Sequence, residues 1–236
     1  MPLSQQAAMA RHDELQAMHV SDRHAARTVD SLAAADWSAP SVLPDWSRAH
    51  VIAHLALNGA GLARALEGVL AGNRVPMYVS GASRDADIAE LAAARPAQIR
   101  ARFAAATSWF QNVADELTDE HWATGAVLRV PDGPEWPAAE VPVARRREVE
   151  IHHADLGLDR YTPHQWPVDF TTTLLDLATA NHGASGLTPP FMAYADDLDR
   201  TWVIGDHSGG TVRGAAADLV DRVAHLDALE VVPTCR

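Results

Sequence analysis

The sequence contains little cysteine, little positive charge and no long apolar run. Its single cysteine, Cys235, lies next to the last residue of a 236-residue chain. A cysteine in that position has no partner for a disulfide within the chain and is poorly placed for catalysis. We therefore expect any thiol chemistry in this protein to use a thiol brought from outside.

Positive charge is scarce, with 19 Lys and Arg against 31 Asp and Glu, a formal net charge of -12. The compact basic cluster is 145–147, so we expect no binding to nucleic acid or to anionic membranes. No apolar stretch reaches the ~20 residues of a membrane span, and the N-terminus lacks the charge and apolar run of a signal peptide. These absences favour a cytoplasmic protein.

Helical periodicity dominates the first two thirds of the chain. It predicts helices over residues 3–35, 48–71, 84–94, 96–117 and 142–157, with Ser47 or Asp45 capping the second. Residues 125–137 contain a turn sequence and indicate a short hairpin or extended excursion. Residues 75–83, too irregular for a helix, are expected to form a loop. Residues 1–160 are thus predicted to form a helical bundle.

The last third of the chain mixes helix and strand. Helices are predicted over residues 170–184 and 215–228, and strands over 201–204 and 211–214. Prolines between residues 159 and 167 mark the change. We therefore predict an α+β protein, with a helical domain over residues 1–160 and a smaller α/β domain over residues 161–236.

Three side chains are spaced as the ligands of a metal ion. Glu148 and His152 are four residues apart, so a helix presents them on one face, and His54 lies on a helix predicted to be an antiparallel neighbour. Two imidazoles and one carboxylate suit zinc, and three protein ligands leave a fourth position open. An open position is typical of a catalytic metal site.

Spacing alone leaves other ligand sets open. His50 lies one turn before His54, and His153 follows His152, so each competes for a place at the ion. The step from Glu148 to His152 fits one helix face better than the step from Glu148 to His153. A histidine on an amphipathic helix is also more often packed or solvated than bound to metal.

Two sequence blocks resemble those of a known family. Residues 46–58, WSRAHVIAHLALN, and residues 147–157, REVEIHHADLG, are similar to conserved blocks of the mycothiol-dependent maleylpyruvate isomerase family in the DinB-like metalloenzyme superfamily. The segment PMYVS at residues 76–80, followed by Arg84, resembles the isomerases more narrowly. The resemblance implies a DinB-like four-helix bundle with His54, Glu148 and His152 as metal ligands. The C-terminal part is loosely similar to the small sterol-carrier-like α/β domain that these isomerases append.

The resemblance also implies an activity: zinc- and mycothiol-dependent conversion of maleylpyruvate to fumarylpyruvate in aromatic (gentisate) catabolism. We expect Arg84 and Arg222 to bind the dianionic substrate, although a gapless comparison places Asp221, not Arg222, at the family's functional arginine. Asn58 and Tyr78 are expected to contact the thiol cofactor. The expected partners are a small dicarboxylate and a low-molecular-weight thiol, bound by a monomer or weak homodimer.

Two alternatives to the isomerase remain at this point. One is a mycothiol S-transferase that joins the same thiol to another electrophile, and the other is a metal-binding module without turnover. Two site residues also have alternative roles. Asn58 either orients a ligand or caps a neighbouring group, and Asp155 either accepts a hydrogen bond behind a metal ligand or ends its helix.

Overall fold

The computed structural model describes residues 3–185, 190–205 and 208–230. The chain divides into two compact units, Met1–Gly157 and Leu158–Arg236, which are described separately below. The first unit is mostly helical and the second contains a small sheet, so the predicted α+β class is confirmed. The exact domain boundary stays a prediction. Among the described residues, no helix combines the length and the apolar character that crossing a membrane requires.

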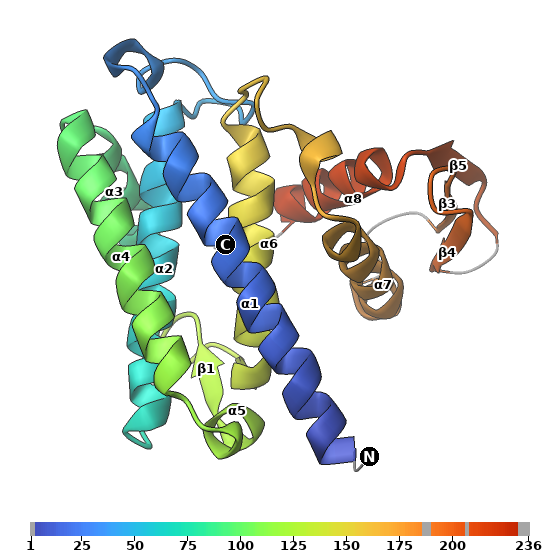
Figure 1. Cartoon of the computed structure of the whole chain (residues 1–236), viewed down its shortest axis with the longest axis horizontal. Helices are drawn as coiled ribbons and strands as arrows, with labels where there is room; N and C mark the ends of the chain where they lie inside the picture. Colours follow the sequence, from blue (N-terminus) through green and yellow to red (C-terminus); the bar gives the residue numbers. More distant parts are fainter. Residues whose placement is uncertain (1–2, 186–189, 206–207, 231–236) are drawn as a thin grey trace. The chain divides into compact units, whose positions relative to one another are not determined.

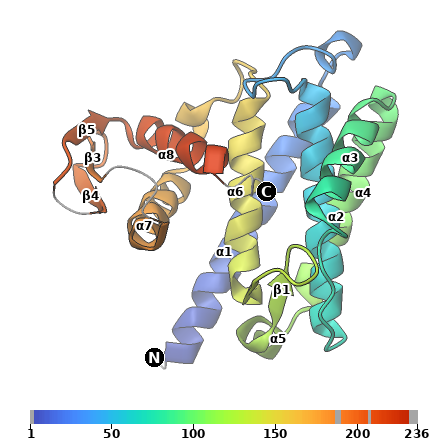
Figure 2. The same cartoon turned by 180° about the vertical axis from the view of Figure 1, so that it is seen from behind.

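The first unit is a four-helix bundle with two additional α-helices (Figure 1). Its bundle helices are α1 (Leu3–Asp30), α2 (Arg48–Leu70), α4 (Pro96–Glu116) and α6 (Val141–Asp155). Helices α1 and α6 run in one direction and α2 and α4 in the other, so α2 and α6 are antiparallel. Helix α3 (Gly81–Ala92) packs on α2, as the view from behind also shows (Figure 2).

Local signals explain where most of these helices begin and end. Ser47 caps α2 by accepting a hydrogen bond from the His50 amide, which confirms one of the two predicted caps. Helix α1 ends at Asp30, before the predicted residue 35. The reason is a second local structure: the Asp36 carboxylate accepts from the Ala33 amide at 2.8 Å and opens a separate 3₁₀ helix, Ala34–Asp36. Helix α3 begins earlier than predicted because Ser80 caps it.

The connection between α4 and α6 contains the predicted hairpin. A short helix that the periodicity did not reveal, α5 (Asp119–Thr124), precedes strands β1 (Ala126–Leu128) and β2 (Glu135–Pro137). The two strands are antiparallel, and a 3₁₀ helix, Ala138–Glu140, leads into α6. The loop after α2 runs beside β1, because the Met77 amide donates to the Leu128 carbonyl at 3.0 Å. The hairpin therefore supports the loop that enters α3.

A charged network lies within the apolar core of the bundle. The core packs Met18, Leu62, Leu66, Phe110 and Val141, all nearly inaccessible to solvent. Among them, the buried Arg145 guanidinium donates to the Leu55 carbonyl at 2.9 Å, to Asn58 Oδ1 at 2.9 Å and to Asp22 Oδ1 at 3.1 Å. These contacts join α6 to α2 and α1.

Two members of the basic cluster at 145–147 are thus core residues. Arg145 and Arg146 are 0% and 3% exposed, and Arg146 pairs with Glu14 at 3.4 Å. Gly59 makes room for Arg145, because a Cβ at this position would lie 3.3 Å from its Nη2. The cluster is therefore mainly structural.

The second unit places a small sheet beside two helices. Helix α7 (Val168–Ser185) follows a 3₁₀ helix, Pro163–Gln165, and α8 (Ala216–Glu230) ends the described chain. Strands β3 (Phe191–Ala195), β4 (Arg200–Ile204) and β5 (Thr211–Gly214) form a sheet in the order β4-β3-β5. Strand β3 pairs antiparallel with β4 and parallel with β5. This central strand escaped the sequence analysis because its short apolar run follows two prolines without polar alternation.

The buried ion pair predicts a large stability effect. Arg145→Met should lower the free energy of unfolding by about 3–5 kcal/mol, because it leaves the Asp22 carboxylate charged and unpaired in the core. The double variant Asp22→Asn/Arg145→Met should recover part of this loss. Arg74→Met is the control, because Arg74 and Glu135 form an exposed pair worth less than about 1 kcal/mol. Urea unfolding measures all three, and equal losses in Arg145→Met and Arg74→Met would contradict the assignment.

Candidate metal centre

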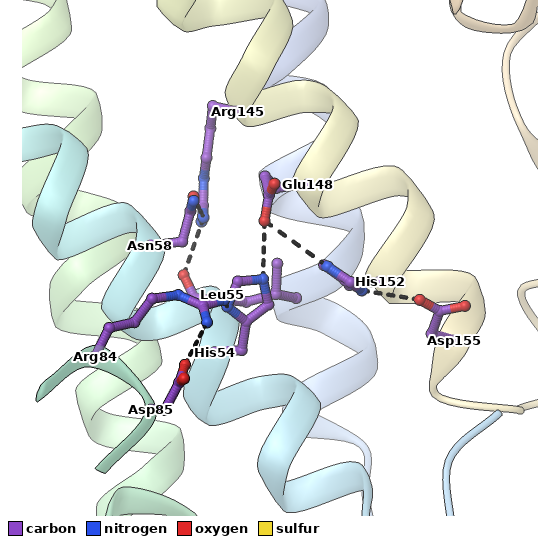
Figure 3. Close-up of polar contacts among 9 residues, drawn as sticks. All are labelled: His54, Leu55, Asn58, Arg84, Asp85, Arg145, Glu148, His152 and Asp155. Atoms are coloured by element: carbon purple, nitrogen blue, oxygen red, sulfur yellow. Dashed lines mark hydrogen bonds and ion pairs between the residues drawn. The ribbon is translucent and has the colours of Figure 1, made fainter. Parts of the chain in front are cut away.

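Three potential metal ligands converge between α2 and α6 (Figure 3). Nε2 of His54 lies 2.8 Å from Oε2 of Glu148, and Nε2 of His152 lies 3.8 Å from the same oxygen. One ligand atom from each residue lies within 4.8 Å of the others. In the part of the chain that the structure describes, no other three His, Cys, Asp or Glu side chains meet in this way.

The neighbours of His152 orient its ring. Its Nδ1 is 2.8 Å from Oδ2 of Asp155, a buried carboxylate one turn later on α6. A carboxylate only accepts, so Nδ1 carries a hydrogen, and the neutral ring therefore has its lone pair on Nε2. Asp155 therefore has the hydrogen bond that the sequence analysis considered for it. Such a contact fixes the tautomer that binds a metal through Nε2.

His54 is enclosed by an arginine and a tryptophan. Its side chain is almost fully buried, and Trp46 packs edge-on with ring centroids 5.8 Å apart. Arg84 reaches in from α3, with Nη2 3.1 Å from His54 Nδ1 and Nη1 2.7 Å from Asp85 Oδ1. The structure thus brings Arg84 next to the predicted ligand, as Figure 3 shows.

The two competing histidines make other contacts. Nδ1 of His50 lies 2.7 Å from the Ser47 hydroxyl at the start of α2. Nε2 of His153 lies 2.8 Å from the Thr28 hydroxyl of α1. Neither residue belongs to the group that could hold an ion, so the tertiary structure selects His54 and His152.

Burial and hydrogen bonding leave the ligands in metal-binding forms. Burial lowers the pKa of His54 to about 4, against the opposing effect of its hydrogen bond with Glu148. For Glu148, burial alone would raise the pKa, but the His54 hydrogen bond and the electrostatic effects of His54, His152 and Arg147 lower it well below its usual value. At neutral pH the site therefore holds a neutral imidazole and a carboxylate, the forms that bind a metal ion.

The other predicted site residues have different surroundings. Tyr78 is buried in the loop before α3, and burial raises the pKa of its hydroxyl. Asn58 accepts a hydrogen bond from Arg145, so it caps a neighbouring group, one of its two expected roles. Arg222 is exposed on α8 of the second unit. The binding roles of Asn58, Tyr78 and Arg222 stay predictions.

The loop carrying Tyr78 is held on both sides. Arg64 of α2 donates to the Met77 carbonyl at 2.6 Å, and the Tyr78 amide donates to the Arg129 carbonyl at 2.9 Å. Gly61 allows the loop to approach α2, since a Cβ there would lie 3.2 Å from the Met77 Cβ. Sequence reasoning did not find Arg64 or Arg129, because neither belongs to a motif.

The comparison with known proteins identifies the family. The family described as mycothiol maleylpyruvate isomerase N-terminal domain matches residues 18–157. The chain belongs to this family. The resemblance of the two sequence blocks is thereby confirmed, and the match spans α2, α3 and α6, which carry the site.

Two solved members of the isomerase family have the same fold. A crystal structure of the mycothiol-dependent maleylpyruvate isomerase is 26% identical, with a TM-score of 0.82, over 91% of this chain and 88% of that chain. A histidine-to-alanine mutant of that isomerase is 25% identical, with a TM-score of 0.81, over the same shares of the two chains. No curated protein matches the sequence.

The donor set of this family member fits a divalent metal ion. His54, Glu148 and His152 offer two nitrogens and one oxygen from two rigid antiparallel helices. Asp155 fixes the orientation of the His152 imidazole, and Glu148 is already ionised in the metal-free protein. Three protein donors leave room for an exogenous ligand.

Graded substitutions test the site as a metal centre. His54→Ala should abolish tight zinc binding, because it removes a direct donor. Asp155→Asn should weaken zinc binding about 10- to 100-fold, because it removes the acceptor that orients His152. His50→Ala is the matched control and should keep wild-type affinity. Competition with a chromophoric chelator measures all three, and equal affinities for His54→Ala and His50→Ala would exclude this ligand set.

The pKa of His54 predicts acid sensitivity of the metal-free protein. The unfolded His54 takes up a proton below about pH 6.5, whereas the folded one stays neutral to about pH 4. The contribution of His54 to the free energy of unfolding is therefore fully present above pH 6.5. It decreases as the pH falls, by about 2 kcal/mol at pH 5. Urea unfolding in the presence of a chelator measures this effect. Between pH 7.5 and 5, the free energy of unfolding should fall more steeply for wild type than for His54→Gln. Parallel curves would contradict it.

Proposed function

We propose that this protein is a cytoplasmic zinc- and mycothiol-dependent isomerase that converts maleylpyruvate to fumarylpyruvate in aromatic catabolism. The observation that carries the proposal is the convergence of His54, Glu148 and His152 beside Arg84, in a chain of this isomerase family. The solved isomerases support it through 25% and 26% identity over 91% of the chain.

The three ligands hold the metal in this proposal. His54 and His152 donate through Nε2, and Glu148 through its carboxylate, while Asp155 keeps His152 in the required tautomer. When bound, zinc supplies a positive charge that lowers the pKa of a thiol in its open position. The chain's own Cys235 lies outside the described residues, and the sequence offers no other cysteine. The nucleophile is therefore a separate molecule, for which we propose mycothiol.

The thiol supplies reversible covalent catalysis. As a thiolate it would add to the alkene carbon, move the electron pair onto the conjugated carbonyl, and leave after rotation about the resulting single bond. Tyr78 and Asn58 are proposed to position it. The raised pKa of Tyr78 keeps its hydroxyl protonated, so this residue can donate a hydrogen bond.

Arg84 is proposed to bind a substrate carboxylate. A guanidinium only donates, so its contact with His54 Nδ1 requires a lone pair on that nitrogen. When His54 binds zinc through Nε2, the neutral ring carries its proton on Nδ1, and Arg84 needs another acceptor. A substrate carboxylate accepts a charge-assisted hydrogen bond well. Arg222 stays the proposed second anchor.

An absorbance assay of maleylpyruvate isomerisation tests this function. The zinc-loaded protein should turn over with mycothiol and return it unchanged, and Arg84→Met should lower kcat/KM about 10- to 100-fold through loss of a charge-assisted contact. Arg74→Met, which removes the same charge from an exposed pair, should have no effect. Turnover without thiol would contradict the mechanism. Consumption of mycothiol with formation of a thioether would indicate the S-transferase.

A further inference from the structure

Two arginines face the same buried aromatic ring. The guanidinium carbons of Arg84 and Arg129 each lie 5.9 Å from the centroid of the Tyr78 ring. Because both guanidinium carbons lie 5.9 Å from the same point, the distance between them is at most twice 5.9 Å. Tyr78 is only 8% exposed, and both arginine side chains are partly shielded from water. Both guanidinium groups are positively charged, and partial shielding from water reduces the screening between them.

Arg129 lacks the carboxylate partner that Arg48 and Arg145 have. Arg48 pairs with Asp36 at 3.4 Å and Arg145 with Asp22 at 3.1 Å. Within the described ranges, no carboxylate lies at ion-pair distance from Arg129. A shielded cation without an anion is costly, so a bound anion would stabilise this arrangement.

Arg84 contacts the candidate metal centre, and the backbone of Arg129 is joined to the loop that carries Tyr78. Arg84 contacts His54 Nδ1 at 3.1 Å. The backbone of Arg129 is joined to that of Tyr78 by a 2.9 Å hydrogen bond, and Arg64 holds the adjacent Met77 carbonyl. A site fixed before binding loses little conformational entropy when its ligand arrives.

We infer that Arg129 is a further substrate-binding residue, which forms with Arg84 a pair of cations across Tyr78 that recognises dicarboxylates. Each guanidinium binds one carboxylate of a short dianion, so Arg129 competes with Arg222 for the role of second anchor. This inference rests on the proposed function for the identity of the substrate, and it adds a specificity-determining residue to the first unit. A monocarboxylate engages one arginine and gains no contact with the other.

Calorimetric titration of the zinc-loaded protein tests the inference without turnover. The probes are succinate, a dicarboxylate, and butyrate, a monocarboxylate of the same chain length. Arg129→Met should weaken succinate binding about 10- to 100-fold, as expected for loss of a charge-assisted pair, and should reduce the preference for succinate over butyrate. Arg129→Lys, which keeps the charge without the planar fork, should lie between wild type and Arg129→Met.

Two further variants serve as controls. Arg74→Met removes the same charge from an exposed pair and should bind both probes like wild type. Arg222→Met removes the other proposed anchor, on the second unit. Zinc content of Arg129→Met should equal that of wild type, since this arginine is not a metal ligand. Its thermal unfolding temperature should be no lower than that of wild type, since the variant removes an unpaired charge.

The outcomes separate the inference from the proposed function. Unchanged succinate affinity in Arg129→Met, loss of succinate binding in Arg222→Met alone, or no succinate binding by wild type would each overturn the role of Arg129. Loss of zinc in Arg129→Met would also overturn it, because the residue would then act on the metal centre. Selective loss of succinate binding without maleylpyruvate turnover would support the dicarboxylate site and reject the isomerase.

Discussion

The buried ion pair between Arg145 and Asp22 is the contact on which the site most depends. Arg145 lies three residues before Glu148 on α6, and its guanidinium binds the carbonyl of Leu55, the residue after His54. The same hydrogen bonds that neutralise a charge in the core therefore fix the register of α2 against α6. That register sets the separation of His54 and Glu148, because both side chains project from the same stretch of the helix pair.

Local positive charge at the site contrasts with the acidic protein around it. The net charge of -12 disfavours anions in general, but Arg84 and Arg129 concentrate positive charge against Tyr78. Partial burial reduces screening, so these two side chains have a stronger effect on a nearby ligand than distant surface carboxylates. This local positive charge is the basis of the proposed dicarboxylate site.

The sequence predicted the α+β class and most of the helices, because apolar periodicity, proline positions and the Ser47 cap are local signals. It missed α5, which is too short to show periodicity, and β3, whose apolar run does not alternate. It extended α1 too far, because Ala33 to Ala35 favour helix in isolation, whereas the Asp36 side chain accepts from the Ala33 amide and caps a separate 3₁₀ helix there. Strand β3 pairs with β4 and β5, and such partners cannot be recognised from its own residues.

By itself, the sequence determined the types of donor available and the helical step that places Glu148 and His152 on one face. It also carried the two blocks that indicate the family. Only the tertiary structure decided that His54 meets them while His50 and His153 turn to other partners, and that Arg129 lies beside Tyr78. The physical reason is that spacing along a helix follows from its own geometry, whereas contacts between helices depend on their rotation and register. In this protein, contacts between residues far apart in the sequence, such as Arg145 and Asp22, set the rotation and the register of the helices.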